Sequence, residues 1–258
     1  MKLTFFKFQG TGNDFIMIDN RQNIFDKNDT KLVAFLCDRR FGIGADGLIL
    51  LENEAGVDFK MVYYNSDGNE SSMCGNGGRC LVAFAKYLNL IKDTASFNAV
   101  DGFHYATISD DIVSLQMKDV NTVIVKLNSV FLDTGSPHHV QEVNQLKDFA
   151  VKAEGARLRY GVYGEKGSNI NFVEQSTDSS FNVRTYERGV EDETLSCGTG
   201  VTAVAIAMHK TGKTSDNKVK IHAVGGDLEV NFENSDDVYT NIFLTGPAKF
   251  VFKGEINV

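Results

Sequence analysis

Two cysteines in this chain each stand directly before a Gly-x-Gly sequence, a setting in which a thiol can do acid–base chemistry. Cys74 opens the sequence CGNGG and Cys197 opens CGTGV, and an apolar stretch follows each of them. This pattern predicts a helix that starts at the glycines, where unpaired backbone N–H groups and the positive end of the helix dipole lie. Such a helix start lowers the pKa of a thiol and can bind a carboxylate. The glycines also let the backbone approach a ligand closely.

Two thiols that face one carbon atom suggest one particular reaction. One thiolate removes a proton from one face, and the other thiol returns a proton to the opposite face, so the stereocentre is inverted. An α-amino acid needs such help because its Cα–H is a very weak acid, and helix amides that hold its carboxylate would stabilise the charge that develops. A lone free cysteine is more often a small buried hydrophobic residue. The recurrence of the same sequence favours the chemical role.

A repeat with a fixed offset runs through the chain. Cys197 follows Cys74 by 123 residues. The same offset relates Thr11-Gly12-Asn13 to Thr134-Gly135-Ser136, Gly44 to Gly167, Gly75 to Gly198, and Gly77 to Gly200. This period is too long for a solenoid. It predicts an internal duplication with two similar lobes across a cleft, each lobe having strands, a helix and a cysteine at the start of that helix.

The elements that must position the cysteines are mostly strands. Apolar or alternating segments predict strands at 2–8, 15–19, 58–64 and 238–244. Helices are predicted at 29–40, with an Asp or Thr cap, at 77–90, at 143–158 and at 198–213.

Composition narrows the class of protein. The chain is 42% hydrophobic and 23% charged, and its net charge of -8 argues against a nucleic-acid surface. No apolar run approaches the ~18 residues of a membrane span, and the first residues show no sustained signal-peptide core. We therefore expect a cytoplasmic protein that binds neither membrane nor nucleic acid. The four cysteines form no C-x-x-C pair, which gives little support to a zinc or thioredoxin-type site.

Two other motifs are poor candidates for a site. GIGADG at 42–47 matches G-x-G-x-x-G, but a dinucleotide site needs a strand before the glycines and a helix after them, and here the order is reversed. Cys80 lies six residues after Cys74 and could resolve a disulfide with it, although core packing is the commoner fate. Cys37 is expected in the core as well.

Polar residues before each cysteine add a possible second binding point. Under the offset of 123, Arg188 matches Asn65, and both precede their cysteine by nine residues. An arginine there can bind a carboxylate through two hydrogen bonds, and a surface ion pair with Glu187 is the plainer alternative. His138, in a turn, is expected to be either solvated or functional.

Taken together, these segments resemble the diaminopimelate epimerase family, amino acid epimerases that work without pyridoxal phosphate. The resemblance spans nearly the whole chain. Its carriers are GTGNDF (10–15), NSDGNESSMCGNGGRC (65–80), GSPHHV (135–140), ERG (187–189) and SCGTG (196–200).

The resemblance implies an α+β fold of two similar lobes, each a mixed, mostly antiparallel sheet curled into a barrel around a central helix. The last strand would cross back to complete the first lobe. The N-terminal lobe would then comprise 1–118 plus 247–258 and carry Cys74, and the C-terminal lobe would comprise 119–246 and carry Cys197. The family is commonly homodimeric, which makes a homodimer the expected assembly.

The implied reaction is the interconversion of LL- and meso-2,6-diaminoheptanedioate, a small amino acid, in lysine and peptidoglycan precursor biosynthesis. No cofactor and no metal are implied. The resemblance assigns catalytic roles to Cys74 and Cys197, as the acid–base pair, and to His138 and Glu187. It assigns substrate binding to Asn13, Asn65, Gly75, Asn76, Asn169, Glu187, Arg188, Gly198 and Thr199, with Arg188 as the partner of the distal carboxylate.

Two positions depart from the family pattern. Ser136 stands where many members carry Asn, so a hydroxyl, which can still donate a hydrogen bond, replaces the side-chain amide there. Gly47 stands where many members carry Gln, and glycine supplies no side chain, so that contact is not expected.

Three other readings stay open. A proline or hydroxyproline racemase or epimerase resembles the same two-cysteine plan, although Arg188 and the Asn residues favour a substrate with a second carboxylate. A dithiol redox protein would use Cys74 and Cys80. A binding module that has lost its chemistry would have no need of two thiols.

Overall fold

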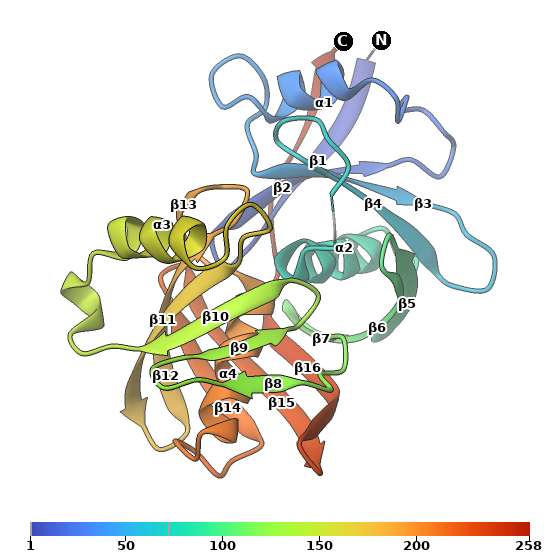
Figure 1. Ribbon diagram of the computed structural model, residues 1–258. Coiled ribbons are helices and arrows are strands. Elements are labelled where there is room, and N and C mark those ends of the chain that lie inside the picture. Colours follow the sequence, from blue (N-terminus) through green and yellow to red (C-terminus); the bar gives the residue numbers. More distant parts are fainter. Residues whose placement is uncertain (1, 72) are drawn as a thin grey trace. The chain divides into compact units, whose positions relative to one another are not determined.

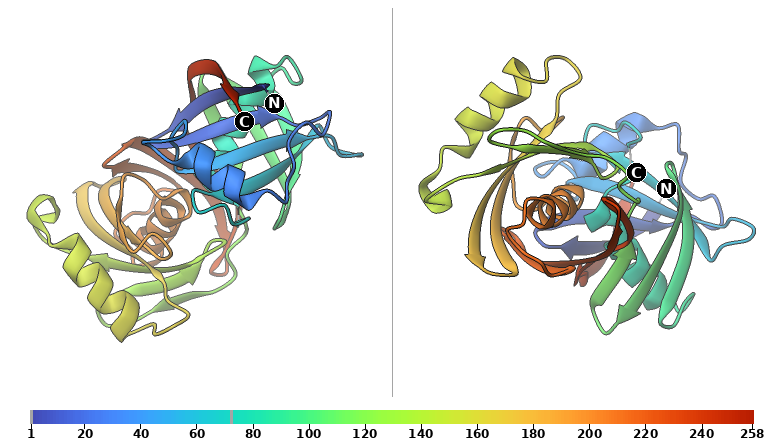
Figure 2. Two further views of the ribbon diagram at one scale, coloured as in Figure 1. Left: turned by 90° about the horizontal axis from the view of Figure 1, so that it is seen from above. Right: turned by 60° about the horizontal axis from the view of Figure 1, so that its bottom comes forward.

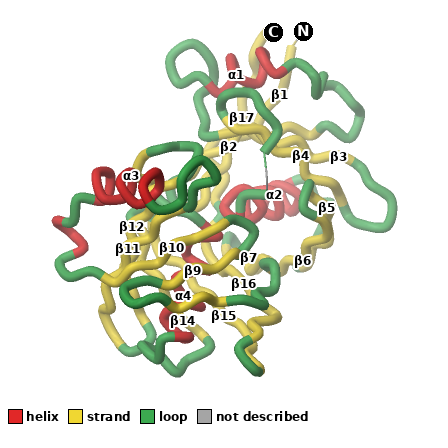
Figure 3. Tube along the Cα trace, viewed as in Figure 1, coloured by secondary structure: helices red, strands yellow, loops and turns green. Residues whose placement is uncertain are grey.

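The structure is a computed structural model that describes residues 2–71 and 73–258. The chain forms two compact units (Figure 1): Met1–Leu115 with Gly246–Val258 makes up the first unit, and Gln116–Thr245 makes up the second. Strands predominate over helices in both (Figure 3), so the predicted α+β class is confirmed. Ser72, part of the motif before Cys74, lies outside the described residues.

The first unit is built on a mixed, mostly antiparallel sheet. Its strands follow the order β17-β1-β2-β3-β4-β5-β6-β7, in which β2 and β3, and also β4 and β5, are parallel neighbours. Strand β17 comes from the end of the chain and pairs with β1 from Lys2↔Asn257 onward, so the C-terminal segment completes this sheet. The strands are β1 (Lys2–Gly10), β2 (Asn13–Asp19), β3 (Gly47–Glu52), β4 (Phe59–Asn65), β5 (Thr94–Ala99), β6 (Gly102–Ser109), β7 (Ile112–Gln116) and β17 (Lys249–Asn257).

Helix α2 (Gly75–Tyr87) is enclosed by this sheet. It contacts β1, β2, β3, β4, β6 and β17, which together span the sheet almost from edge to edge. Every residue from Gly75 to Ala85 is buried; apart from Asn76 and Arg79 these residues are small or apolar, as expected for an enclosed helix. Phe84 packs against Phe6 and Phe8 of β1, with ring centroids 5.0 and 5.7 Å away. The sheet therefore holds the start of α2 in a fixed place.

Helix α1 (Thr30–Cys37) begins where the sequence predicts and ends three residues early. The Asp29 carboxylate accepts the N–H of Leu32 at 2.9 Å, which confirms the predicted cap. The helix stops because Asp38 turns to extended backbone, with ψ 125°, and its side chain accepts the N–H groups of Arg40 and Phe41.

The second unit repeats this plan. Its strand order is β8-β9-β10-β11-β12-β14-β15-β16, in which β10 and β11, and also β12 and β14, are parallel, and β13 pairs with β12. The strands are β8 (Val123–Val125), β9 (Val130–Asp133), β10 (Pro137–Glu142), β11 (Asn169–Thr177), β12 (Ser180–Glu187), β13 (Asp192–Thr194), β14 (Lys218–Ala223), β15 (Gly226–Ser235) and β16 (Val238–Pro247).

Helix α4 (Gly198–Lys210) occupies the place in this unit that α2 has in the first. Strands of its unit surround it in Figure 2, and it contacts β9, β10, β11, β12, β14 and β15. Both helices have 13 residues and start 123 positions apart, and the parallel strand pairs fall at corresponding places in the two sheets. The predicted duplication is therefore confirmed.

The predicted helix at 143–158 is partly wrong. Leu146–Asp148 form a separate 3-10 turn, η1, and helix α3 (Val151–Gly161) begins after it. Phe149 interrupts the helix because its backbone is extended, with ψ 138°, and its ring packs on Phe172 with centroids 4.6 Å apart. Among the described residues, no helix is both long and apolar enough to cross a membrane.

Candidate active site

Cys74 is the N-cap residue of α2. Its backbone is extended, with φ -107° and ψ 122°, and its carbonyl accepts the N–H of Gly78 at 2.7 Å as the first hydrogen bond of the helix. The usual cap residues place a side-chain oxygen on the N–H groups of the first turn, whereas sulfur is a weak acceptor. The first-turn amides can therefore receive an anion beside the thiol.

Asn76 connects this helix start to the turn after β1. Its amide nitrogen donates to the side-chain oxygen of Asn13, and its amide oxygen accepts hydrogen bonds from Arg79 at 3.0 Å and Thr11 at 3.5 Å. Arg79 also donates to the carbonyl of Gly75 at 3.4 Å. Three of the predicted binding residues, Asn13, Gly75 and Asn76, thus lie together.

A charged network fixes Asn13 from its other side. Its amide nitrogen donates to Asp46 at 2.9 Å, and Arg39 donates to both Asp46 and Asp14, at 2.8 and 2.6 Å. Burial alone would raise the pKa of Asp14, but hydrogen bonds from Arg39 and Lys7 outweigh it and lower that pKa below its ordinary value. Asp14 therefore stays ionised at neutral pH, and the network keeps the Asn13 turn in place.

Asn65 lies at the exposed end of β4, opposite Gly47 in the β3–β4 ladder. A Cβ added to Gly47 would lie 2.5 Å from the Tyr63 ring and 2.6 Å from the Tyr64 carbonyl oxygen. A side chain at this position would have to displace Tyr63. The glycine at position 47 is thus explained by packing, and a side-chain contact from it is not available to this chain.

Cys197 is the N-cap of α4 with nearly the same geometry. Its φ is -121° and its ψ is 111°, and its carbonyl accepts the N–H of Val201 at 2.8 Å. Its Sγ lies 3.5 Å from the hydroxyl of Thr199. The Thr199 carbonyl accepts a hydrogen bond from Thr134 at 2.8 Å, which fixes the first turn to the strand region before it. Gly198 and Thr199 can therefore present their amides as Gly75 and Asn76 do.

His138 and Asn171 form a buried polar pair that borders the start of α4. A Cβ added to Gly200 would lie 2.5 Å from Asn171 Oδ1 and 3.4 Å from Cys197 Sγ, so both groups adjoin this glycine. Asn171 Nδ2 donates to the carbonyl of His139 at 3.0 Å and lies 3.2 Å from His138 Nδ1. Nδ1 is therefore the acceptor, and the ring proton lies on Nε2.

The imidazole of His138 is neutral. Burial, with a smaller contribution from the charge of Arg188, lowers the pKa of His138 to about 3. Its Nε2 is buried and has no hydrogen-bond partner among the described residues. His138 can therefore donate one hydrogen bond to a bound ligand but cannot act as a cation at neutral pH.

Glu187, Arg188 and Asn169 lie together where β12 ends and β11 begins. The backbone N–H of Arg188 donates to Asn169 Oδ1 at 2.9 Å, and Glu187 accepts a hydrogen bond from Thr194. The exposed guanidinium of Arg188 donates to the Lys166 carbonyl at 2.9 Å. This bond uses one of its five N–H donors, so the side chain retains donors for a carboxylate.

The other two cysteines are poor acid–base candidates. Cys37 and Cys80 are buried, and burial raises the pKa of each thiol to about 12. A thiol of this kind stays protonated and is a weak nucleophile. This observation also disfavours a redox pair of Cys74 with Cys80.

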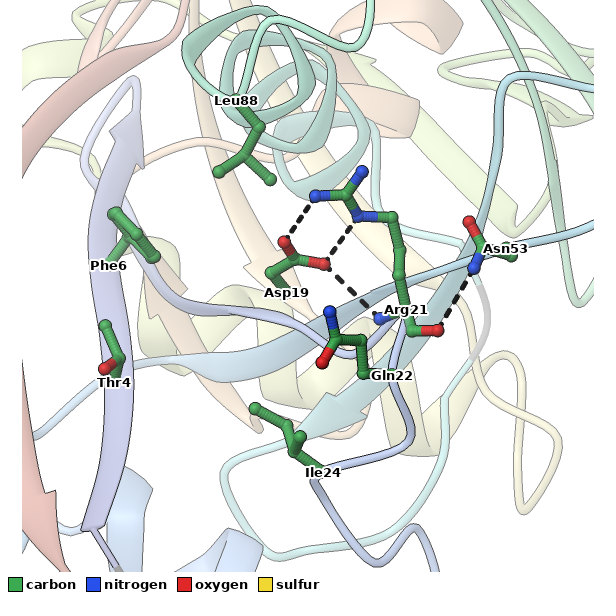
Figure 4. A pocket seen from close by; sticks show the side chains of 8 residues that line it. All are labelled: Thr4, Phe6, Asp19, Arg21, Gln22, Ile24, Asn53 and Leu88. Carbon is green, nitrogen blue, oxygen red and sulfur yellow. Dashed lines mark hydrogen bonds and ion pairs between the residues drawn. The ribbon is translucent and has the colours of Figure 1, made fainter.

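A pocket of about 510 Å³ lies in the first unit (Figure 4). It is lined by Thr4, Phe6, Asp19, Arg21, Gln22, Ile24, Asn53 and Leu88. The Arg21 guanidinium is bound by Asp19 at 2.7 and 2.6 Å, so its charge is already balanced. Leu88 caps the opposite end of α2 from Cys74, and none of the predicted site residues lines the pocket. No cluster of three or more metal-ligating side chains occurs in the described part of the chain.

Sequence reasoning missed two residues that support the helix starts. Arg79 belongs to the motif around Cys74, but a charged residue within a helix is ordinarily read as exposed. Asn171 lies two residues after Asn169 on β11. Alternation along a strand puts such a pair on one face, and this is the signal that could have identified Asn171.

Comparison with known proteins gives the family. The sequence model of diaminopimelate epimerase matches residues 5–123 and 130–251. The diaminopimelate epimerase of Flavobacterium psychrophilum is 65% identical over 258 residues, which cover 99% of this chain and 100% of that protein.

Solved structures show the same fold at low sequence identity. A PhzF-family phenazine biosynthesis protein from Bacillus anthracis has a TM-score of 0.80 and 11% identity, with 100% of both chains covered. A hydroxyproline epimerase from Agrobacterium vitis, solved with bound trans-4-hydroxy-L-proline, has a TM-score of 0.70 and 14% identity, with 99% of this chain and 92% of that chain covered. The structural likeness concerns the fold, whereas the family match and the 65% identical relative concern the sequence over almost its whole length, and on that ground this chain belongs to the diaminopimelate epimerase family.

Proposed function

We propose that this protein is an isomerase that converts LL-2,6-diaminoheptanedioate to the meso form, without an organic cofactor or a metal. The observation that carries the proposal is the placement of Cys74 and Cys197 as N-caps of the two duplicated helices, in a member of this family. The 65% identical relative that bears the name diaminopimelate epimerase supports the choice of substrate.

In the proposed mechanism, one thiolate removes the α-proton of the substrate and the other thiol delivers a proton to the opposite face. Both sulfur atoms must therefore reach one substrate carbon. The first-turn amides of α2, at Gly75 and Asn76, and of α4, at Gly198 and Thr199, would bind the reacting carboxylate. Their partial positive charge would stabilise the anion that forms as the proton leaves. Positioned acid–base groups of this kind contribute about 10²–10⁴-fold to the rate.

The remaining residues would orient the substrate. We expect Glu187 and His138 to support catalysis near the reacting amino group. Arg188 would bind the distal carboxylate through its remaining N–H donors. Asn13, Asn65 and Asn169 would complete the binding site with their side-chain amides.

We also propose a cytoplasmic homodimer that acts in lysine and peptidoglycan precursor biosynthesis. The names of the relatives, diaminopimelate epimerases, support the pathway, and the homodimer rests on the resemblance to the family. Light scattering on the purified protein tests the assembly, and a monomer at micromolar concentration would contradict it.

A second candidate is a proline or hydroxyproline racemase or epimerase. The fold similarity to the hydroxyproline epimerase of Agrobacterium vitis favours it. These substrates have no second carboxylate, so they leave Arg188 without a role.

Turnover in deuterated water tests both candidates. The protein is incubated with LL-diaminopimelate, L-proline or trans-4-hydroxy-L-proline, and loss of the Cα proton is followed by NMR. We expect exchange and formation of the meso isomer with LL-diaminopimelate, no exchange with the other two, and the same result for a Cys37→Ala control. Exchange with proline or hydroxyproline alone would overturn the proposal.

A further inference from the structure

Arg79, in the second turn of α2, is a buried cation that has no carboxylate partner among the described residues. Arg79 is 0% exposed and lies one helical turn after Asn76 on the same face. Its guanidinium donates to three neutral oxygens, in the side chains of Asn76 and Thr11 and in the Gly75 carbonyl, at 3.0, 3.2 and 3.4 Å. Its Nε is buried and lacks a hydrogen-bond partner within the described residues.

Burial of an unbalanced charge is costly, so this arginine is not explained by stability. An apolar side chain of similar volume would fill the same space at no electrostatic cost. Burial lowers the pKa of Arg79 to about 10, so the guanidinium is still charged at neutral pH. A buried cation of this kind is expected where an anion forms or binds.

The groups around Arg79 leave one candidate for that negative charge within the protein. The guanidinium donates to the carbonyl of Gly75, the residue that follows Cys74, and the titratable groups that act on the pKa of Arg79 are the thiols of Cys80 and Cys74. Cys80 is itself buried, and its pKa of about 12 keeps it neutral. The charge of Asp14 on β2 also raises the pKa of Cys80, and Lys7 already balances this carboxylate in an ion pair. The thiol of Cys74 is the remaining group that can become an anion.

The second unit has no such cation at the equivalent place. The offset of 123 residues relates Arg79 to Thr202, which is also fully buried. The Thr202 hydroxyl donates to the Gly198 carbonyl at 3.0 Å, within its own helix. The two helix starts therefore share their backbone but differ by one positive charge.

We propose that Arg79 is a positioning residue that sets the charge at the start of α2. It holds Asn76 in place for the reacting carboxylate and stabilises the thiolate of Cys74, so that Cys74, and not Cys197, is the resting thiolate. The carboxylate part rests on the proposed function, whereas the thiolate part concerns the protein without substrate.

Alkylation of the resting protein tests the thiolate part. Wild type, Arg79→Gln and Arg79→Lys are treated with iodoacetamide between pH 5 and pH 9, and the modification rates of Cys74 and Cys197 are read by peptide mass spectrometry. An opposite charge nearby lowers a pKa by about 1–3 units, so we expect Arg79→Gln to slow Cys74 alkylation at pH 7 by about 10-fold or more. We expect Arg79→Lys to lie closer to wild type, and Cys197 to be unaffected in both.

Two further variants keep the test decisive. Arg79→Met carries the same expectation if Arg79→Gln is too unstable, because an apolar side chain removes the charge without leaving a polar group unpaired. Arg184→Met removes an arginine that Glu193 neutralises, and it should leave the Cys74 curve unchanged. A folded neutral variant with the wild-type Cys74 curve would overturn the proposal.

Turnover separates this inference from the proposed function. In Arg79→Gln we expect the acidic limb of the kcat/KM profile to move to higher pH, which a merely structural role would not cause. A shifted alkylation curve in a protein that does not turn over diaminopimelate would support the role of Arg79 and contradict the proposed function. Normal turnover of diaminopimelate by Arg79→Gln with an unshifted alkylation curve would support the proposed function and contradict the role of Arg79.

Discussion

The start of helix α2 is hydrogen-bonded to the buried guanidinium of Arg79, whereas the start of helix α4 lies among neutral hydrogen-bonding groups. In the first unit, Arg79 donates to Asn76 at 3.0 Å. In the second unit, Thr202 returns its hydroxyl to its own helix, and the neighbouring His138 is uncharged. The helices have equal length and equivalent cysteine caps, so the difference lies in the side chains that surround them.

This difference shows how a duplicated fold can give an unequal pair of thiols. A reaction that removes one proton and returns another needs a base and an acid at the same time, while duplication alone supplies two like groups. Environments that move two pKa values apart assign the roles. A buried cation on one side and neutral donors on the other would do so without any change in the backbone.

Removal of either cysteine should have the largest effect on this comparison. If both thiols act on one carbon, Cys74→Ala and Cys197→Ala should each lower kcat for epimerisation by about 10²–10⁴-fold, since each removes one proton-transfer group. Cys80→Ala, in which a thiol that stays protonated is removed, should keep near-normal kcat. Steady-state kinetics with LL-diaminopimelate measures all three. A single site variant with normal turnover would contradict the two-base scheme.

Oxidation tests whether the two unequal thiols act at one place. Peroxide converts a thiolate to a sulfenic acid, which a second thiol attacks with loss of water to give a disulfide. We expect peroxide to remove most of the activity and a reductant to restore it, with a Cys74–Cys197 disulfide visible by mass spectrometry before reduction. Loss of activity that reductant does not restore, or no loss at all, would count against the shared carbon.

The two helix starts could be predicted from the sequence, but the buried charge of Arg79 at one of them could not. Cys74 and Cys197 could be predicted as helix caps because the Gly-x-Gly sequences and the apolar stretches after them are local signals. The duplication could be predicted because a single offset of 123 residues survives in the turn residues. Arg79 was not predicted, because its burial is imposed by strands that are distant in sequence, and only their packing around α2 turns a surface residue type into an internal cation.

The prediction of one continuous helix at 143–158 failed for a similar reason. Most residues of 143–158 favour a helix, and the contact of Phe149 with Phe172 on β11 decides that the helix begins only at Val151. Asn171 escaped notice because its role depends on the carbonyl of His139 in the neighbouring parallel strand. Both outcomes depend on the pairing of elements and not on local preference.

Two equivalent glycines, Gly77 in α2 and Gly200 in α4, test the comparison with a smaller expected effect. Gly200→Ala would place a Cβ 2.5 Å from Asn171 Oδ1, whereas Gly77→Ala, at the equivalent position, would place one 3.0 Å from the flexible end of Ile49. We expect Gly200→Ala to cost about 1–3 kcal/mol of unfolding free energy through overpacking. Displacement of Asn171 and Cys197 should also lower kcat/KM by about 10- to 100-fold.

Gly77→Ala serves as the control for this pair. Alanine favours a helix over glycine by about 1 kcal/mol, and this gain should roughly offset the contact with Ile49. Urea denaturation and kcat/KM on both variants measure the difference. Equal losses in the two variants would mean that the two helix starts are packed alike, against what the distances indicate.

Acid should lower the free energy of unfolding through His138, the neutral histidine that borders the start of α4. Burial lowers the pKa of this histidine from 6.5 to about 3, so below pH 6.5 the unfolded chain takes up a proton that the folded protein excludes. The unfolded state then binds more protons, and the free energy of unfolding falls as the pH drops from 6.5 towards 3. At ~1.4 kcal/mol per pH unit this amounts to about 2 kcal/mol by pH 5. Urea denaturation at pH 7.5 and pH 5 should therefore show a smaller acid loss in His138→Asn than in wild type, and equal losses in the two proteins would mean that the imidazole can be protonated in the folded state.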